Sequence, residues 1–279
     1  MDLNDLNWDD IRVFVATARA QSFRQAAANL RMSHPTVRRR LESLEETTGL
    51  KLFQRGVDGL HPTLEGQELL EAATAVEGAM QSLARRAQAA DTRMHGPVTL
   101  TAPPPMARLL LPDLAAFSQE HPGIRLIIKA SSAVFDLARM EADVAIRAMY
   151  DGRQPDPSLI GRKAITGSWA VYGQPGATHW LSPHDDPAWV KGTPFPNAPV
   201  RAVIQDVALL AQACRDGMGM ARLPCFLMDK VPNLTQPEKV YDVWVLVHPD
   251  LRRNPRLKII RDALVAALQR HQHLFDGPT

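Results

Sequence analysis

The sequence predicts an α/β protein in three parts: a small helical domain with a hairpin at residues 1–62, a long helix at 63–92, and a larger two-lobed α/β domain at 93–279. Three observations support this fold class. Apolar residues recur at helical spacing before residue 48, residues 63–91 contain no proline, and strand-like and helix-like stretches alternate from residue 96 onward. With 279 residues, 45% of them hydrophobic, the chain is long enough to bury separate cores.

Composition excludes several classes of protein. The formal net charge is only +2, so any basic surface must be local. No apolar run is long enough to cross a bilayer, and the acidic start "MDLNDLNWDDIRVF" lacks the basic and apolar regions of a signal peptide. The two cysteines are too few for a disulfide framework and fit a reducing compartment. We therefore expect a cytoplasmic protein.

Short helices account for residues 6–48. The first, in "LNWDDIRVFVATARA", has apolar residues at helical spacing. The second begins at Ser22, with Gln25 three residues later in a capping-box pattern. For the third, Ser33 can act as N-cap and Pro35 is tolerated in the first turn. Its buried stripe is expected to consist of Val37, Leu41 and Leu44.

The third helix also carries a basic face, "RRR" at 38–40. At about 100° per residue, Arg39 points away from the buried stripe, and Arg38 and Arg40 flank it. Two helices of this size with a tight joint, the second exposing basic side chains, are typical of a helix-turn-helix. By itself the run is equally compatible with a solvated charged surface.

The segment after the basic helix decides between these interpretations. "LKLFQRGVDGLHPTLEG" supplies two short extended pieces around a turn from Gly56 to Gly59, which predicts a β-hairpin, or wing. We expect Arg55 at the base of this wing, where it can reach a minor groove or a phosphate. Three helices and a hairpin that share one core make a winged helix-turn-helix.

Several spaced residues carry a resemblance to a known family. Phe14, "SF" at 22–23, "AA" at 26–27, "LE" at 44–45, "GLKLFQR" at 49–55 and "T..G" at 63–66 resemble the DNA-binding domain of LysR-type transcriptional regulators. The resemblance runs from about residue 6 to residue 90. Arg38 departs from it, because the family usually has a small hydroxyl residue there, and Pro62 replaces the usual leucine. We expect the first departure to change base preference or add a phosphate contact, and neither to break the fold.

Double-stranded DNA is therefore the expected partner of the basic face. The residues best placed to face the major groove are His34, Pro35, Thr36, Arg38 and Arg39. Arginine pairs bidentately with guanine, and threonine can contact a thymine methyl group. Ser33, Arg40 and Arg55 are expected to contact phosphates, which fix register and make the affinity depend on salt.

Residues 63–91 predict a helix on the order of 40 Å long. Its apolar residues alternate at spacings of four and three, as in a seam that pairs helices: Leu69, Ala73, Val76, Met80, Leu83 and Ala87. Such a seam is too long for so small a domain to bury, so we expect a homodimer through residues 63–92. The resemblance adds a homotetramer as an alternative. Packing of the seam against the chain's own next domain is the other interpretation.

From residue 96 the pattern predicts βαβ units with a parallel sheet. Strands are expected at "VTLTA", "RLIIKAS", "DVAIRAM", "SWAVYG", "VRAVIQ", "MARLP" and "YDVWVLVH". Helices are expected to end at "SQEHPG", to form at "VFDLARMEA", to form at "DVALLAQACRDGMG" with Asp206 as the cap, and to form at the C-terminus. "EHPGIRL", "DVAIR", "ACRDGMGMARLP" and "VHPDLRRNPRLK" resemble the effector domain of LysR-type regulators, which implies two periplasmic-binding-protein-like lobes around a cleft. The proline-rich segment 174–199 is shorter than the family's, so we expect the second lobe to lack a helix.

Ligands of such folds bind at the carboxyl ends of strands. This rule nominates Thr101, Ala102, Ser131, Ser132 and Arg147 for a small-molecule effector, which in the family is commonly a small carboxylate or aromatic acid. The prolines at 103–105 remove backbone N–H groups that would bind an anion. Three interpretations stay open: a less anionic effector, polar contacts from the serines and the arginine instead, or a vestigial pocket. Strand-end capping is an equal alternative for the serines.

The sequence gives little support for a redox, metal or catalytic site. Cys214 and Cys225 fit buried packing better than a redox switch, and His179 and His184 match no firm metal-ligand spacing. We find no nucleophile motif, phosphate-binding loop or acid/base pair, so we expect neither an enzyme nor a cofactor. The sequence favours a regulator that binds interrupted palindromic promoter sites under effector control and contacts RNA polymerase. The alternatives are an architectural DNA-binding dimer that needs no effector, and an enzyme fused to a DNA-binding domain.

Overall fold

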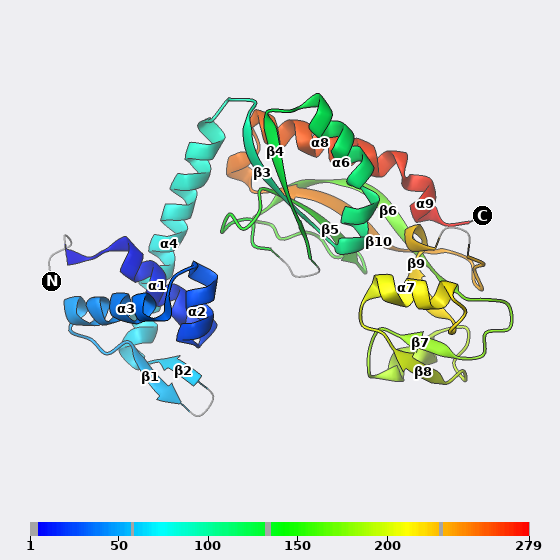
Figure 1. The fold of residues 1–279 in the computed structure, drawn as a ribbon, viewed down its shortest axis with the longest axis horizontal. Coiled ribbons are helices and arrows are strands. Elements are labelled where there is room, and N and C mark those ends of the chain that lie inside the picture. Colours follow the sequence, from blue (N-terminus) through cyan, green and yellow to red (C-terminus); the bar gives the residue numbers. More distant parts are fainter. Residues whose placement is uncertain (1–4, 57–58, 132–134, 229–230, 279) are drawn as a thin grey trace. The chain divides into compact units, whose positions relative to one another are not determined.

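A computed structural model describes residues 5–56, 59–131, 135–228 and 231–278. The chain forms two compact units, residues 1–84 and 85–279 (Figure 1), and each is described by itself. None of the helices described reaches the length and apolar character that a membrane crossing requires.

The first unit is the predicted winged helix-turn-helix. Its elements are α1 (Trp8–Ala20), α2 (Phe23–Leu30), α3 (His34–Thr48), β1 (Phe53–Gly56), β2 (Gly59–Pro62) and the first part of α4 (Leu64–Ala90). The expected stripe of Val37, Leu41 and Leu44 is buried, and it packs against the buried face of α1 around Phe14. The predicted stripe is thus confirmed, since the apolar spacing gives α3 one face that water does not reach.

Side-chain caps fix where the helices begin. The Ser22 hydroxyl accepts a hydrogen bond from the Gln25 amide at 3.4 Å, and the Ser33 hydroxyl accepts one from the Thr36 amide at 3.2 Å. The Gln25 side chain donates to Asn29 at 3.1 Å instead of bonding back to Ser22, so only half of the expected capping box forms. These caps set the joint between α2 and α3.

The long helix α4 begins against Lys51 and Leu52, in the segment that joins α3 to β1. The Thr63 hydroxyl accepts from the Gly66 amide at 3.0 Å, and a Cβ on Gly66 would lie 2.2 Å from the Leu52 carbonyl oxygen, so only glycine fits. The predicted apolar seam of α4 is buried at one end and exposed at the other. Ala73 is buried and Leu69 half-buried in the core of the first unit, whereas Val76, Met80 and Leu83 are 42%, 40% and 62% exposed. Among the residues that the structure describes, none buries the stripe of Val76, Met80 and Leu83.

The second unit is built on one six-stranded sheet. Its elements are β3 (Gly96–Ala102), α5 (Pro104–Leu109), α6 (Leu111–Glu120), β4 (Ile124–Ala130), β5 (Val144–Tyr150), β6 (Ile160–Tyr172), β7 (Trp180–Ser182), η2 (Pro187–Gly192), β8 (Val200–Val203), α7 (Val207–Arg215), β9 (Ala221–Pro224), η3 (Cys225–Leu227), β10 (Glu238–Val247), η4 (Pro249–Leu251), α8 (Pro255–Arg270) and α9 (Gln272–Asp276). The strand order is β4-β3-β5-β10-β6-β9. β4, β3 and β5 run parallel, which confirms the predicted parallel pairing for these three strands, whereas the pairs with β10 and β9 are antiparallel.

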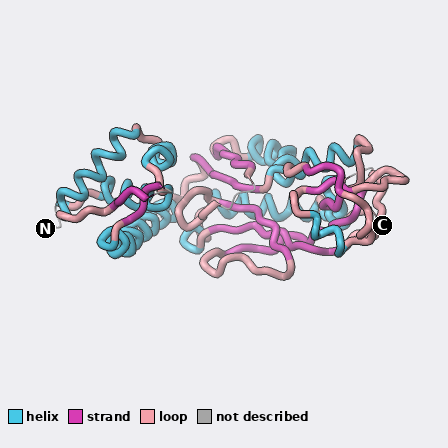
Figure 2. Tube along the Cα trace, turned by 90° about the horizontal axis from the view of Figure 1, so that it is seen from below, coloured by secondary structure: helices cyan, strands magenta, loops and turns pink. Residues whose placement is uncertain are grey.

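The core of this unit lies between the sheet and helices α5, α6 and α8 (Figures 1 and 2). The second lobe is smaller: β7 pairs with β8, and α7 packs near β9. Residues 174–199 form β7 and η2 but no α-helix, as expected from their proline content. Asp206 caps α7 by accepting from the Ala208 and Leu209 amides at 3.0 and 2.8 Å, which confirms its predicted role.

The helix expected at 134–142 does not form in its described part, residues 135–142, which make turns instead. The Asp136 carboxylate accepts from the Ala138 and Arg139 amides at 2.8 and 3.1 Å, and the Glu141 carboxylate accepts from the Asp136 amide at 2.8 Å. Short acidic side chains that bond to nearby amides compete with helix hydrogen bonds. The prediction of a helix here was wrong for this reason.

Candidate DNA-binding surface and effector site

The start of α3 and the wing form one concave surface. His34, Arg38 and Arg55, all nominated from the sequence, line a pocket of about 280 Å³. Its other charged residues are Lys51, Glu42 and Glu45. The ring of His34 packs edge-on against Phe23 with centroids 5.9 Å apart, which orients it at the first turn of the helix. Three basic side chains and two glutamates line this surface, so it carries an excess of one positive charge with which to meet a phosphate backbone.

The first turn of α3 also holds the predicted Ser33, Pro35 and Thr36. The hydroxyl groups of Ser33 and Thr36 are 2.7 Å apart, so capping places both at the exposed tip of the helix. Pro35 is exposed, and Thr36 is half-buried. The bond between the two hydroxyl groups uses one of their two protons, so the other hydroxyl proton of the pair is left to donate to a phosphate.

The three consecutive arginines differ in their partners. Arg38 pairs with Glu42 at 2.8 Å on the surface. Arg39 is exposed and has no ion pair within the described part of the chain. Arg40 is bound to two carboxylates of α1, Asp10 at 2.9 Å and Asp9 at 3.1 Å, and its side chain is 26% exposed. The charges of Arg39 and Arg40 therefore face different surroundings although the residues are neighbours.

Arg55 lies farther along the wing than expected. It pairs with Leu60, and the next pair, Gly56 with Gly59, precedes the turn, so Arg55 is near the tip of the wing and not at its base. The turn residues 57–58 fall outside the described residues. Lys51 was missed from the sequence. It is 82% exposed and held by Glu45 at 2.7 Å, and its only signal was a positive charge next to "LF".

The nominated effector residues lie around the ends of β3, β4 and β5. Thr101 and Ala102 are the last two residues of β3, and both are buried. Ser131 follows β4, and its amide donates to the Ala102 carbonyl at 3.0 Å. Ser132 lies outside the described residues. Arg147 was expected after β5 but lies inside it, opposite Trp244 of β10.

Two of these side chains carry polar atoms without partners. Thr101 Oγ1 and Arg147 Nη2 are buried and make no hydrogen bond within the described chain. Thr101 pairs with Ala145, and Arg147 is two residues farther along β5, so the two side chains project from the same face of adjacent strands. Burial lowers the pKa of Arg147 by desolvating its charge. Buried donors without partners are costly, so this face has unmet hydrogen-bonding capacity.

The helix that follows β3 offers no backbone donors at its start. Pro103 stands at the N-cap of α5 without a side-chain cap, and Pro104 and Pro105 form its first turn. None of the three has an N–H group. An anion at this strand end would have to be bound by side chains.

The cysteines are buried packing residues. Cys214 is 0% exposed and Cys225 is 4% exposed, and neither forms a disulfide. Burial raises the pKa of Cys214 to about 11 and also raises the pKa of Cys225, so both thiols stay protonated. No group of three or more potential metal ligands occurs among the residues that the structure describes. The ring of His179 bonds to the Met218 carbonyl, a structural contact.

Comparison with known proteins identifies both units. Residues 8–67 match the bacterial regulatory helix-turn-helix proteins of the lysR family, and residues 91–195 match the LysR substrate-binding domain. The chain is 26% identical to the HTH-type transcriptional regulator CrgA of Neisseria meningitidis serogroup B, with 94% of this chain and 97% of that protein covered. It is 27% identical to the Mau operon transcriptional activator of Paracoccus denitrificans, with 90% and 92% covered.

Solved structures show the same fold. The structure of CrgA, a LysR-type transcriptional regulator, aligns with a TM-score of 0.54 at 25% identity over 94% of this chain and 99% of that one. The full-length Vibrio cholerae virulence activator AphB aligns with a TM-score of 0.56 at 18% identity over 94% and 99%. The second of these likenesses concerns the fold alone.

Proposed function

The chain belongs to the LysR family of DNA-binding transcriptional regulators, which are not enzymes, and on this premise we propose how it reads DNA, pairs and responds to a small molecule. The proposed target is an interrupted palindromic promoter site on double-stranded DNA. The proposed compartment is the cytoplasm, where a bacterial regulator meets DNA and RNA polymerase.

The first turn of α3 enters the major groove. The residues proposed to face base edges are His34, Pro35, Thr36, Arg38 and Arg39, and those proposed to contact phosphates are Ser33, Arg40 and Arg55. The observation that carries this proposal is that His34, Arg38 and Arg55 line one concave surface although they come from two elements. Arg39 has the charge most available for DNA, since Arg40 is already bound by two carboxylates.

A second copy of the chain covers the exposed stripe of α4. Val76, Met80 and Leu83 repeat on one face of the helix and are exposed in the single chain. A dimer through this face would present two recognition helices to paired half-sites, which raises affinity and specificity together. Two such dimers can form a tetramer.

The effector binds where β3, β4 and β5 end. Thr101 and Arg147 supply the buried polar atoms that have no partner within the described residues, and Ala102 and Ser131, whose backbones are hydrogen-bonded to each other, lie beside them. Ser132 is proposed as a further polar contact. An effector that binds two arrangements of the lobes with different affinities would shift the spacing of half-sites and the contact with RNA polymerase. DNA footprints that are identical with and without the true effector would contradict this mechanism.

Sequencing of the genomic fragments that the purified protein retains tests the DNA-binding proposal. The variant is Arg38→Ala with Arg39→Ala, and Arg86→Ala, an exposed arginine on α4, is the matched control. We expect discrete sites with dyad symmetry for the intact protein and the control, lost or redistributed in the double variant. Diffuse retention that the double variant does not change would mean that α3 does not read sequence.

An architectural dimer that needs no effector is the second candidate. One observation favours it: the three prolines that precede and open α5 remove the backbone donors at the end of β3. A thermal-shift screen of metabolite classes separates the two functions, because a ligand that binds the folded state raises Tm. Stabilisation by any class favours the regulator with an effector, and stabilisation by none favours the architectural dimer.

A further inference from the structure

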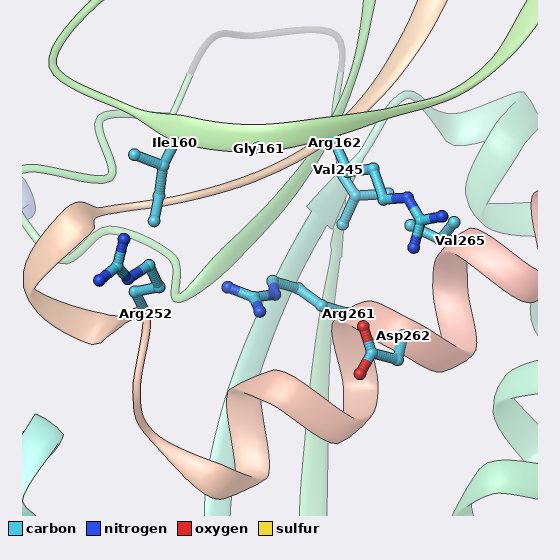
Figure 3. Close-up of a pocket in the computed structure, with 8 residues that line it drawn as sticks. All are labelled: Ile160, Gly161, Arg162, Val245, Arg252, Arg261, Asp262 and Val265. Carbon is cyan, nitrogen blue, oxygen red and sulfur yellow. The ribbon is translucent and has the colours of Figure 1, made fainter.

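A pocket lined with arginines lies away from the nominated effector residues. It occupies about 290 Å³ where the start of β6 and the helix α8 face the end of β10 (Figure 3). Its charged side chains are Arg162, Arg252, Arg261 and Asp262, and its apolar lining includes Ile160, Val245 and Val265. Three positive charges face one negative charge, so the pocket carries an excess of two positive charges.

The arginines of this pocket have no carboxylate partners. Within the described chain, neither an ion pair nor a side-chain hydrogen bond involves Arg162, Arg252 or Arg261. Other arginines of the same unit are neutralised: Arg85 pairs with Asp250 at 3.0 Å, Arg256 with Asp91 at 3.1 Å and Arg270 with Asp113 at 2.6 Å. In these three pairs a carboxylate already balances the guanidinium charge, whereas the arginines of the pocket have none within the described chain.

The arginines come from separate elements. Arg252 follows η4, Arg261 belongs to α8 and Arg162 to β6. In Figure 3 the side chain of Arg261 extends toward the side of the pocket where Arg252 lies. Ile160 and Val245 lie on the strand side of the same space. Like charges that line one pocket repel, and an anion bound between them would offset this repulsion with charge-assisted hydrogen bonds.

This pocket is separate from the proposed effector site. Val245 lines the pocket, whereas Trp244, the neighbouring residue of β10, pairs with Arg147. Successive residues of a strand project to opposite faces of the sheet. The pocket therefore opens on the face that α8 covers, and Arg147 and Thr101 project from the other face.

We propose that this pocket binds a small organic anion, with its carboxylate or phosphate group between Arg252 and Arg261 and a short apolar part on Ile160, Val245 and Val265. Guanidinium groups suit this recognition because their planar donors match carboxylate and phosphate oxygens in pairs. The volume is at the lower end of the range for ligand pockets, which limits the ligand to a few carbon atoms. Such a ligand would bind in addition to the effector proposed above.

Isothermal titration calorimetry on the full chain tests the proposal with three probes: pentanoate, butyl phosphate and inorganic phosphate, at constant ionic strength. The variant is Arg252→Gln with Arg261→Gln. Its matched control is Arg253→Gln, an exposed arginine next to Arg252 that does not line the pocket. Far-UV circular dichroism confirms that each variant is folded.

We expect saturable binding of pentanoate or butyl phosphate, at least tenfold weaker in the double variant and within about twofold of the intact chain in the control. Asp262→Asn should tighten binding, because it removes the one negative charge of the pocket. If the double variant does not fold, Arg162→Gln replaces it, with weaker binding expected. Tighter binding of pentanoate would indicate a carboxylate ligand, and tighter binding of butyl phosphate would indicate a phosphate ligand.

Three results would overturn the proposal. One is that none of the probes binds saturably up to about 10 mM. Another is that Arg253→Gln weakens binding as much as the double variant, which would indicate attraction by surface charge in general. The third is that inorganic phosphate binds as tightly as butyl phosphate and more tightly than pentanoate, since the apolar lining would then contribute nothing.

Discussion

Arg38, Arg39 and Arg40 stand next to one another on α3 and yet face different partners. Arg38 is matched by Glu42 one turn away, and Arg40 by Asp9 and Asp10 of α1. The helical period, at about 100° per residue, separates adjacent side chains widely enough for this. The direction of each side chain could be predicted from the sequence, but the carboxylates that meet Arg40 could not, because they lie 30 residues earlier in the chain.

Replacing Arg39 should weaken DNA binding without affecting the fold. Arg39→Ala removes an exposed charge that has no partner within the described residues. If Arg39 contacts a phosphate, the slope of log affinity against log salt should fall by about 1, and if it reads a base, specificity at one position should relax by about 1–3 kcal/mol. Fluorescence anisotropy across salt concentrations measures both. An unchanged affinity and slope would remove Arg39 from the interface.

Replacing Arg40 should instead destabilise the first unit. Arg40→Ala leaves Asp10, which is 7% exposed, without its partner at 2.9 Å. Loss of a partner from a largely buried carboxylate costs more than loss of a surface pair, and we expect the free energy of unfolding to fall by about 1–3 kcal/mol. Urea denaturation measures the change, with Arg39→Ala as the matched control. Equal stability of the two variants would mean that this pair contributes nothing.

The cysteines should be unreactive in the folded protein and should make it less stable in alkali. Burial raises the pKa of Cys214 from 9.0 to about 11. Between these pH values the unfolded thiol has lost its proton while the folded one keeps it, so the unfolded state binds fewer protons and stability falls as pH rises. We expect slow thiol labelling at pH 8 in buffer and rapid labelling in guanidinium. Rapid labelling of the native chain would revive the redox interpretation.

At the scale of elements, features that depend on residues close in sequence were predicted correctly. The errors concern segments whose structure depends on pairing with distant strands or on side-chain bonds to the backbone. The caps of α3 and α7 were predicted because their signal lies within three residues. The first half of β6 was missed, since "IGRKAITG" has no clear apolar alternation and is a strand only because it pairs with β10 along Ile160–Trp169. The turns at 135–142 replaced a helix for the related reason that Asp136 bonds to backbone amides.

The exposed stripe of α4 leads to a prediction about association. Met80→Asp places a charge on the stripe of Val76, Met80 and Leu83 and should weaken the homodimer about 100-fold, because each copy loses the burial of one apolar side chain and gains a charge to desolvate. Analytical ultracentrifugation measures the dissociation constant. Thr74→Asp, an exposed residue on the opposite side of the helix, is the control and should leave it unchanged. Equal effects of both variants would place the interface elsewhere.

At the scale of the whole molecule, the sequence predicted two kinds of unit through motifs that recur in order, from "SF" at 22–23 to "VHPDLRRNPRLK". It could not show how the start of the second unit is held. There, buried Arg85 pairs with Asp250 and bonds to the Ala138 carbonyl, and Asn254 donates to the Gln88 carbonyl at 2.8 Å. Contacts across more than 160 residues have no local signal, and the same is true of the arginines that line the pocket beside α8.

Two units with separate cores should unfold in two steps, and ligands should tell the steps apart. Phe14 and Leu44 belong to the core of the first unit, and Leu100 and Ile260 to that of the second. A ligand stabilises the unit that it binds in proportion to the logarithm of its concentration over Kd. In scanning calorimetry, operator DNA should therefore raise mainly the Tm of the first unit, and butyl phosphate mainly the Tm of the second unit. Arg39→Ala should reduce the first shift alone, and Arg252→Gln with Arg261→Gln the second alone. A single transition that both ligands raise equally would show that the two units unfold as one cooperative block.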